Sequence, residues 1–352
     1  MLLREVSLRA IRSYERLDLG LDPGLVLVVG PNGVGKTNLL EAVHVGAQGF
    51  SPRTRSDAEV IRIGAEAGRI ALRGERGGSP VELDVTLQLR AAKKAKLNGA
   101  PLRAAEQLRG EVAALVFTPD RLAIVKGSPV VRRAYFDRAV GRLFPARAAL
   151  PVEYAAAVGQ RNAALRRVGA GLSSRDALSP WTQQVAGLGA ALMEARVEAL
   201  ARLGPPFAAH AEALGLAGAA LEYQGDPAGV EELEARLDRD LERGTTSLGP
   251  HLHDAAILAA DRDLRRFGSQ GEQRVAVLAL LLGEAELLSE RAVPPLLLLD
   301  DVLSELDEGR RRTLAKRIRE VGQSLVTATA AEALPGGPDQ LIEVSPGVAR
   351  AA

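Results

Sequence analysis

Alternation of apolar and polar residues predicts β-strands in the first hundred positions. Residues 6–10 and 81–89 place an apolar side chain at every second position, and residues 69–73 also have β-like character. Residues 25–29 are apolar without interruption, which is typical of a strand buried on both faces. The pair Asn98-Gly99 favours a two-residue hairpin turn.

Helical spacing of apolar residues dominates the middle of the chain, from about residue 120 to residue 244. A helix is also predicted over residues 37–48, and strand patterns return at residues 296–299 and 325–329. Within the middle region, one helical face is formed by Val185, Leu188, Leu192, Ala195, Ala199 and Leu203.

The order of these elements predicts an α/β domain that is divided in the sequence. Its two parts are residues 1–120 and 245–352, and residues 121–244 form a mostly helical inserted domain. No heptad pattern is sustained over many turns, so we expect no long coiled coil.

Composition narrows the class of protein. With 352 residues, 47% of them hydrophobic, the chain can form two domains with sizeable cores. Its longest apolar run, residues 293–299, contains Pro294 and Pro295, and no membrane-spanning helix is expected. The chain has no cysteine and no visible secretory signal, so we expect it in the cytoplasm. Because the formal net charge is +1, a surface that binds nucleic acid must concentrate positive charge locally.

A phosphate-loop pattern, G-x-x-x-x-G-K-[ST], lies between the predicted strand at residues 25–29 and the predicted helix. Backbone N–H groups of such a loop, and the positive end of its helix, bind phosphate oxygens. Lys36 is expected to reach the β- and γ-phosphates of ATP, and Thr37 to bind Mg²⁺. The alternative is a glycine-rich turn that matches by chance, against which the strand and helix context argues. The predicted nucleotide-binding residues are Gly30, Pro31, Asn32, Gly33, Val34, Gly35, Lys36 and Thr37.

A second candidate element is the apolar strand at residues 296–299, which ends in two carboxylates. In a parallel sheet, a neighbouring strand would place such carboxylates beside the phosphate loop. Asp300 is then expected to hold Mg²⁺, and Asp301 to polarise the attacking water. The alternative is a strand that leaves its sheet through a solvated acidic turn.

The sequence of residues 267–274, Phe-Gly-Ser-Gln-Gly-Glu-Gln-Arg, resembles the signature of ABC ATPases. Ser269 and the N–H of Gly271 would form a second anion-binding site at a helix start. One chain needs only one such site for its own triphosphate, so the second is expected to meet the γ-phosphate held by a partner copy. The alternative is an ordinary helix cap, with Glu272 completing a capping box, and both roles can hold at once. Residues 304–307, Ser-Glu-Leu-Asp, resemble the D-loop that follows in ABC ATPases.

Several stretches together resemble the RecF family of bacterial recombination mediators, which are ABC-type ATPases related to the heads of chromosome-maintenance proteins. The resemblance covers nearly the whole chain. The stretches that carry it are residues 31–42, 117–122, 125–137, 160–165 and 299–307.

This resemblance implies an ABC-type ATPase head with mixed β-sheets around the phosphate loop. It implies ATP and Mg²⁺ as cofactors and weak, DNA-stimulated ATP hydrolysis, with Lys36, Asp300, Asp301 and Ser269 as catalytic residues. ATP would close a homodimer on single-stranded, duplex or gapped DNA, and slow hydrolysis would release it. The resemblance also implies partners of the RecR and RecO type, recombinase loading, roles in DNA replication, repair and the SOS response, and no membrane association.

Two positions depart from familiar patterns. After residues 249–251, the family has an arginine and an acidic pair, whereas Leu252 and His253 occupy the first two places here, and their roles stay open. ABC transporters carry a histidine after the last strand of the site. The candidates for that γ-phosphate contact here are Thr327 and Thr329.

Basic residues in three groups are candidates for contacts with DNA phosphates, although each group could equally be a solvated face. Because aromatic residues are only 3% of the chain, base stacking is not expected to dominate. The candidates are Arg53 and Arg55, then Lys93, Lys94 and Lys96, then Arg161, Arg166 and Arg167.

Two other functions compete with this interpretation. The nucleotide-binding subunit of an ABC transporter would have a much shorter segment between phosphate loop and signature than the one from Lys36 to Ser269. A phosphotransferase would use the phosphate loop but would need neither Ser269 nor a D-loop.

Overall fold

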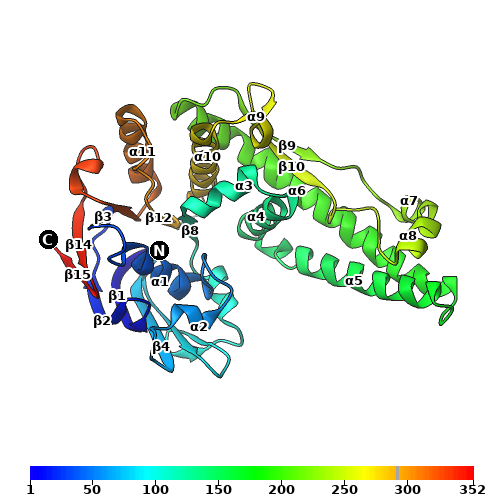
Figure 1. The fold of residues 1–352 in the computed structure, drawn as a ribbon, viewed down its shortest axis with the longest axis horizontal. Coiled ribbons are helices and arrows are strands. Elements are labelled where there is room, and N and C mark those ends of the chain that lie inside the picture. The colour runs from blue at the N-terminus through cyan, green and yellow to red at the C-terminus, as the bar shows by residue number, and fades with distance from the viewer. Residues whose placement is uncertain (291–292) are drawn as a thin grey trace. The chain divides into compact units, whose positions relative to one another are not determined.

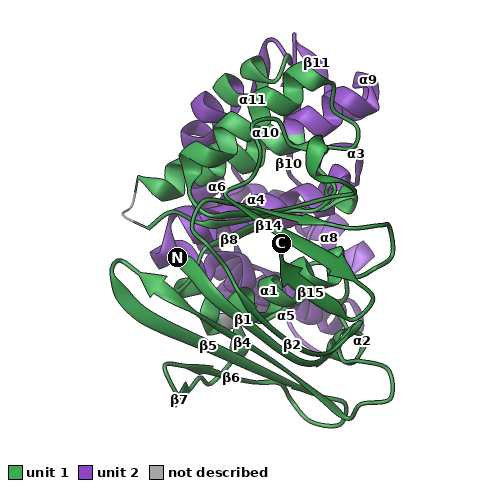
Figure 2. Ribbon diagram, turned by 90° about the vertical axis from the view of Figure 1, so that its left-hand side faces the viewer, with its two compact units in different colours: residues 1–121, 209–215, 277–352 green, residues 122–208, 216–276 purple. Residues whose placement is uncertain are grey.

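The chain folds into two compact units, here called unit 1 and unit 2 (Figure 2). The computed structural model describes residues 1–290 and 293–352. Unit 1 comprises residues 1–121, 209–215 and 277–352, and unit 2 comprises residues 122–208 and 216–276.

An antiparallel sheet in unit 1 is built from the N-terminal part of the chain (Figure 1). Its strands alternate buried and more exposed positions, as the apolar pattern of residues 81–89 predicts. Asn98 and Gly99 form a tight turn between β6 and β7, with φ angles of 50° and 80°. In spatial order the strands are β2 (Tyr14–Gly20), β1 (Leu2–Ile11), β4 (Ala67–Arg76), β5 (Ser79–Gln88), β6 (Lys94–Leu97) and β7 (Ala100–Pro101).

The second sheet of unit 1 is mainly parallel and joins segments from both ends of the chain. β3 pairs in parallel with β13 on one side and with β14 on the other, and all residues of β3 and β13 are buried. Since β13 lies between β3 and β12, Val326 is paired with Leu27 on one side and Leu299 on the other. In spatial order the strands are β15 (Val348–Ala351), β14 (Gln340–Ser345), β3 (Leu25–Val29), β13 (Ser324–Ala328), β12 (Leu296–Leu299) and β8 (Ala114–Phe117).

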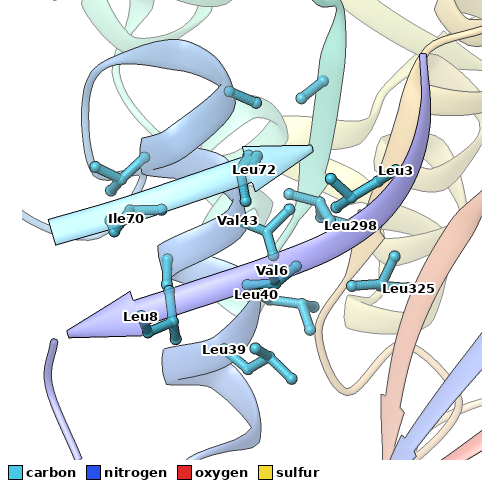
Figure 3. Packing of buried hydrophobic residues seen from close by; sticks show 14 of the residues in the cluster. Leu3, Val6, Leu8, Leu39, Leu40, Val43, Ile70, Leu72, Leu298 and Leu325 are labelled. Atoms are coloured by element: carbon cyan, nitrogen blue, oxygen red, sulfur yellow. The ribbon is translucent and has the colours of Figure 1, made fainter. Parts of the chain in front are cut away.

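Helix α1 (Lys36–Gln48) contributes to the hydrophobic core that the two sheets of unit 1 share. Figure 3 shows Leu39, Leu40 and Val43 of this helix among apolar side chains of both sheets. Each fully buried leucine stabilises the fold by about 1.5–3 kcal/mol relative to an exposed one. This packing fixes the helix start, and with it the loop that precedes the helix. The other labelled residues are Leu3, Val6, Leu8, Ile70, Leu72, Leu298 and Leu325.

The other helices that lie wholly in unit 1 are short or amphipathic. In α11 the apolar residues Leu314, Ala315, Ile318 and Val321 are buried, while most of its charged residues stay accessible. These helices are α2 (Asp57–Val60) and α11 (Glu308–Val321).

Unit 2 is mainly helical and includes a small antiparallel sheet of β11, β10 and β9. Two long helices, α6 and α10, begin in unit 2 and end in unit 1. On α6 the predicted apolar face is buried at Val185, Leu192, Ala195, Ala199 and Leu203. The elements are α3 (Ala123–Lys126), α4 (Pro129–Leu143), α5 (Leu150–Gly169), α6 (Ser179–Ala213), β9 (Ala219–Gln224), α7 (Val230–Ala235), α8 (Leu237–Arg243), β10 (Asp254–Ala259), β11 (Arg262–Asp263), α9 (Leu264–Phe267) and α10 (Gln270–Ser289).

The compact units differ from the expected division at 1–120, 121–244 and 245–352. Residues 245–276, expected with the ATPase domain, lie in unit 2, and residues 209–215 lie in unit 1. The physical reason is a strand pairing: β10 pairs with β9, a strand within the stretch predicted as helical. Residues 254–259, from the segment expected in the ATPase domain, therefore share a sheet with residues 219–224, from the segment expected in the inserted domain.

Short 3₁₀ turns complete the described chain at Ala105–Gly110, Pro119–Leu122, Pro145–Arg147, Arg175–Leu178 and Ala331–Ala333. Within residues 1–290 and 293–352 there is no long coiled coil, as expected. None of the helices in these residues has the length and apolar character needed to cross a membrane.

Candidate nucleotide-binding site

The phosphate-loop residues connect the buried strand β3 to helix α1 in a conformation that requires glycine. Gly30 and Gly35 have φ angles of 153° and 119°, a region that other residues rarely adopt. A Cβ atom on Gly30 would lie 2.4 Å from the carbonyl oxygen of Val344, and one on Gly35 would lie 2.6 Å from Oγ of Ser13. The loop is therefore held closely by its surroundings, and its glycines allow the backbone to take this path.

Lys36, the first residue of α1, folds back over the loop. Its Nζ donates hydrogen bonds to the carbonyl oxygens of Gly30 at 2.6 Å and Pro31 at 2.9 Å. Burial lowers the pKa of Lys36, while the negative charges of Asp300 and Asp301 act in the opposite direction. The ammonium group thus lies at the mouth of the loop, held by carbonyl oxygens that a phosphate oxygen could replace.

Thr37 and Asp300 come together although they are far apart in sequence. The Thr37 hydroxyl lies 2.9 and 3.0 Å from the two carboxylate oxygens of Asp300. The expectation that a neighbouring strand brings the carboxylate to the loop is wrong in one detail, because β13 lies between β3 and β12. Asp300 reaches Thr37 across that intervening strand.

The two adjacent carboxylates have different environments. Asp300 is buried, and burial raises its pKa, against the effect of hydrogen bonds from Thr327 and Thr37. Asp301 is exposed and has a φ angle of 49°, in the left-handed region. This contrast separates a carboxylate fixed inside the site from one that solvent can reach.

Residues 304–307, the segment that resembles a D-loop, follow shortly after the two carboxylates in the sequence. The Ser304 hydroxyl donates to the carbonyl oxygen of Asp301 at 3.2 Å. Asp307 caps helix α11 by accepting a hydrogen bond from the N–H of Arg310 at 2.9 Å. This segment is thus tied to the acidic strand end on one side and to a helix start on the other.

Ser269 lies in unit 2, at the start of α10, and forms the capping box considered above. Its Oγ lies 2.8 Å from Glu272 Oε2, and its N–H donates to the same oxygen at 2.8 Å. The N–H of Glu272 in turn lies 3.3 Å from Ser269 Oγ. The serine is exposed, and Gly271 faces open space, so the cap leaves this helix end accessible.

A cluster around Glu41 lies on α1, the helix that begins with Lys36 and Thr37, and was not among the site residues predicted from the sequence. The buried Glu41 carboxylate accepts two hydrogen bonds at 2.8 Å from Arg12, one at 2.6 Å from Ser51 and one at 3.2 Å from Arg53. Burial alone would raise the pKa of Glu41, but these partners outweigh it and lower the pKa. The signal available in the sequence was an acidic residue among the apolar residues of the helix after the loop.

Beside this cluster lies a hollow of about 490 Å³ that borders the first turn of α1. Ile63 at its rim is fully exposed, and the Arg62 guanidinium donates to the carbonyl oxygen of Ser13 at 2.8 Å. The lining residues are Arg12, Ser13, Asn38, Arg53, Glu59, Ile61, Arg62 and Ile63.

The basic residues considered as DNA contacts differ in whether they are buried, paired with a carboxylate or exposed. Arg161 is completely buried and donates to Asp240 at 2.7 Å, so its expected contact with DNA is wrong. Arg53 pairs with Glu41, and Lys93 lies 3.6 Å from Asp57. The remaining candidates are exposed: Arg55, Lys94, Lys96, Arg166 and Arg167.

The histidines after Gly249 form hydrogen bonds inside unit 2. The His251 ring lies 2.8 Å from the Tyr154 hydroxyl, and the His253 ring lies 2.7 Å from the Tyr223 hydroxyl. Leu252 between them is 56% exposed. No group of three His, Cys, Asp or Glu side chains in the described residues could hold a metal ion.

The phosphate loop follows the buried parallel strand β3, and it faces Asp300, a carboxylate from the same sheet. This arrangement defines a P-loop nucleotide-binding protein. Residues 2–349 match the family described as the RecF/RecN/SMC N terminal domain. The chain belongs to this family and, within it, to the RecF proteins.

Individual relatives agree with this assignment. The chain is 36% identical over 351 residues to the DNA replication and repair protein RecF of Symbiobacterium thermophilum, covering 95% of this chain and 93% of the relative. It is similar to the solved structure of the recombination mediator protein RecF with ATP in the RecFOR pathway, with a TM-score of 0.89 and 26% identity. That match covers 100% of this chain and 97% of the other.

An SMC head bound to the C-terminal winged-helix domain of ScpA shares the fold, with a TM-score of 0.63 and 16% identity, over 100% of this chain and 97% of that one. The expected fold class, an ATPase head with mixed sheets and a helical part, is thereby confirmed. These relatives do not favour the transporter subunit.

Proposed function

We propose that this chain is an ATP-dependent, DNA-binding recombination mediator of the RecF type. The observation that carries the proposal is the hydrogen bond between the Thr37 hydroxyl and the Asp300 carboxylate beside the phosphate loop. The named relative acts in DNA replication and repair, and the similar solved structure contains ATP. The protein would act in the cytoplasm during replication, repair and the SOS response.

Thr37 and Asp300 fit Mg²⁺, because they offer a hydroxyl and a carboxylate, the hard oxygen ligands that this ion prefers. Mg²⁺ is bound in nucleotide sites by few protein groups together with phosphate oxygens, which agrees with a single buried carboxylate here. Bound there, the ion would neutralise the charge that develops on the phosphates.

Around the triphosphate, this chain's own groups have separate tasks. Lys36 would exchange its two carbonyl contacts for the β- and γ-phosphates, and the loop N–H groups would hold the remaining oxygens. Asp301, exposed beside Asp300, would orient the attacking water. The hollow lined by Arg12, Arg62 and Ile63 would receive the ribose and base.

Two copies would close over ATP, since Ser269 belongs to a second anion-binding helix start that one triphosphate does not need. The ATP-bound homodimer would hold single-stranded, duplex or gapped DNA, assist recombinase loading at gaps or junctions, and act with partners of the RecR and RecO type. Weak, DNA-stimulated hydrolysis would then release it.

Binding to DNA should require ATP and weaken steeply with salt. Each neutralised phosphate releases counterions, so several contacts should reduce affinity at least ~10-fold between 50 and 200 mM salt. We would measure binding of single-stranded, duplex and gapped DNA with ATP, with ADP and without nucleotide. Equal affinity in all three nucleotide states, or at both salt concentrations, would contradict the proposal.

Replacing Ser269 with arginine should separate nucleotide binding from dimer closure. The long side chain would meet the partner's γ-phosphate where the hydroxyl should be, while the loop at Lys36 and Thr37 stays intact. Sedimentation should show monomers at every ATP concentration, with ATP affinity within about threefold of the parent, a change below 0.7 kcal/mol.

Two further variants complete that experiment. Ser269→Asp keeps an acceptor for the N–H of Glu272 but places a negative charge against the γ-phosphate, so it should also stay monomeric. Ser174→Arg, at an exposed serine elsewhere in unit 2, should dimerise like the parent. ATP-driven dimers of Ser269→Arg would show that Ser269 is only a helix cap.

A further inference from the structure

Thr327 is a buried hydroxyl on β13, the strand between the phosphate-loop strand and the acidic strand. It is 1% exposed, and its neighbours in the strand, Val326 and Ala328, are apolar. Valine would have nearly the same shape, so packing alone does not require a hydroxyl at this position. The hydroxyl must therefore be explained by its contacts.

The Thr327 hydroxyl contacts both carboxylate residues of the site. Its Oγ1 donates to Oδ1 of Asp300 at 2.9 Å and accepts from the backbone N–H of Asp301 at 2.8 Å. One group thus fixes the side chain of Asp300 and the backbone of Asp301. In this structure its single O–H is directed at Asp300.

Asp301 has a φ angle of 49°, in the left-handed region, which aspartate enters more readily than most non-glycine residues but still seldom. A backbone in this region persists only where the surroundings hold it. The hydrogen bond from its N–H to Thr327 anchors that conformation at the point where the chain leaves β12. The direction of the Asp301 side chain depends on this turn.

We propose that Thr327 is a positioning residue for ATP hydrolysis, which holds Asp300 and Asp301 in a fixed relation to each other. This inference rests on the proposed function. In the ATP-bound state Thr37 would share its hydroxyl with Mg²⁺, and Thr327 would then remain as a donor to Asp300. Thr327 would act through Asp300 and Asp301, the two residues that its hydroxyl contacts.

The test compares Thr327→Val, which removes the hydroxyl at nearly constant volume, with Thr327→Ser, which keeps it. Valine should lower kcat by ~10-fold or more, because displacement of catalytic groups by about 1 Å can cost up to 10²-fold. The KM for ATP should change less than about threefold, since the loop and Lys36 stay in place. Serine should restore kcat to within about threefold of the parent. Thr313→Val on α11, whose hydroxyl donates to the carbonyl oxygen of Gly309 in the same helix, should keep the parental rate.

A second measurement is independent of catalysis. Hydrogen exchange of the Asp301 amide, without nucleotide, should be faster in Thr327→Val than in the parent and in Thr327→Ser. If the parent hydrolyses no ATP, the proposed function fails, while the exchange result still reports on the contact. Parental kcat in Thr327→Val, equal losses in the valine and serine variants, or unchanged amide exchange would each overturn the positioning role.

Discussion

Replacing Lys36 with methionine should abolish ATP binding and every activity that depends on it. Methionine keeps an unbranched apolar stem but removes the ammonium group that now contacts Gly30 and Pro31. Hydrogen bonds to charged groups contribute about 1.5–3 kcal/mol each, so losing two phosphate contacts should weaken binding by at least ~10²-fold. Titration calorimetry with ATP measures this directly.

A matched control for that variant is Lys316→Met, at an exposed lysine on α11. It should bind ATP like the parent. Thermal unfolding of both variants shows whether the loop has simply collapsed, because its carbonyl oxygens lose their donor. Parental ATP affinity in a folded Lys36→Met protein would mean that the nucleotide binds elsewhere.

Replacing Asp301 with asparagine should stop hydrolysis while leaving ATP bound. Asparagine is among the residues that tolerate a positive φ angle, so the turn at 49° should survive the change. The variant removes the negative charge that would polarise the water, and hydrolysis should fall by ~10²-fold or more. In the proposed mechanism, cleavage would remove the γ-phosphate that holds the two copies together, so the dimer should last longer and release DNA more slowly.

Asp300→Asn is the informative comparison, since it alters the buried carboxylate that contacts Thr37. It should weaken Mg²⁺-dependent ATP binding, whereas Asp301→Asn should keep ATP affinity within about threefold. Measuring nucleotide affinity, dimer lifetime and phosphate release for both variants distinguishes the two roles. Turnover at the parental rate in Asp301→Asn would refute its assignment, and loss of Mg²⁺-ATP binding there would exchange the roles.

Features that depend on neighbouring residues could be predicted from the sequence. The phosphate loop, the strand at residues 25–29, the hairpin turn at Asn98 and the buried face of α6 all follow from local spacing or from residues with special backbone freedom. The sequence also predicted that the phosphate loop and the carboxylates after residues 296–299 lie close together, because both motifs have distinctive residue types and spacing.

Features that depend on distant pairings could not be predicted. No local pattern states that β13 separates β3 from β12, so the contribution of Thr327 was invisible until the strand order was known. Arg161 looked like a surface charge because its partner, Asp240, lies far along the chain. The compact units also divide the chain at a place other than residue 245, since β10 completes a sheet with β9.

The strand order of unit 1 also has a consequence for biosynthesis. The antiparallel sheet, which consists of β1, β2 and β4 to β7, uses only residues from the first third of the chain, which leave the ribosome early. By contrast, β3 gains its neighbouring strands only when β13 and β14, near the far end of the chain, have been synthesised. Gly30 also lies close to the carbonyl oxygen of Val344 in β14. Until then an apolar strand built for burial on both faces has no partner, a state prone to aggregation. Translation that stalls before residue 324 should therefore yield a nascent chain that depends on chaperones and cannot bind nucleotide.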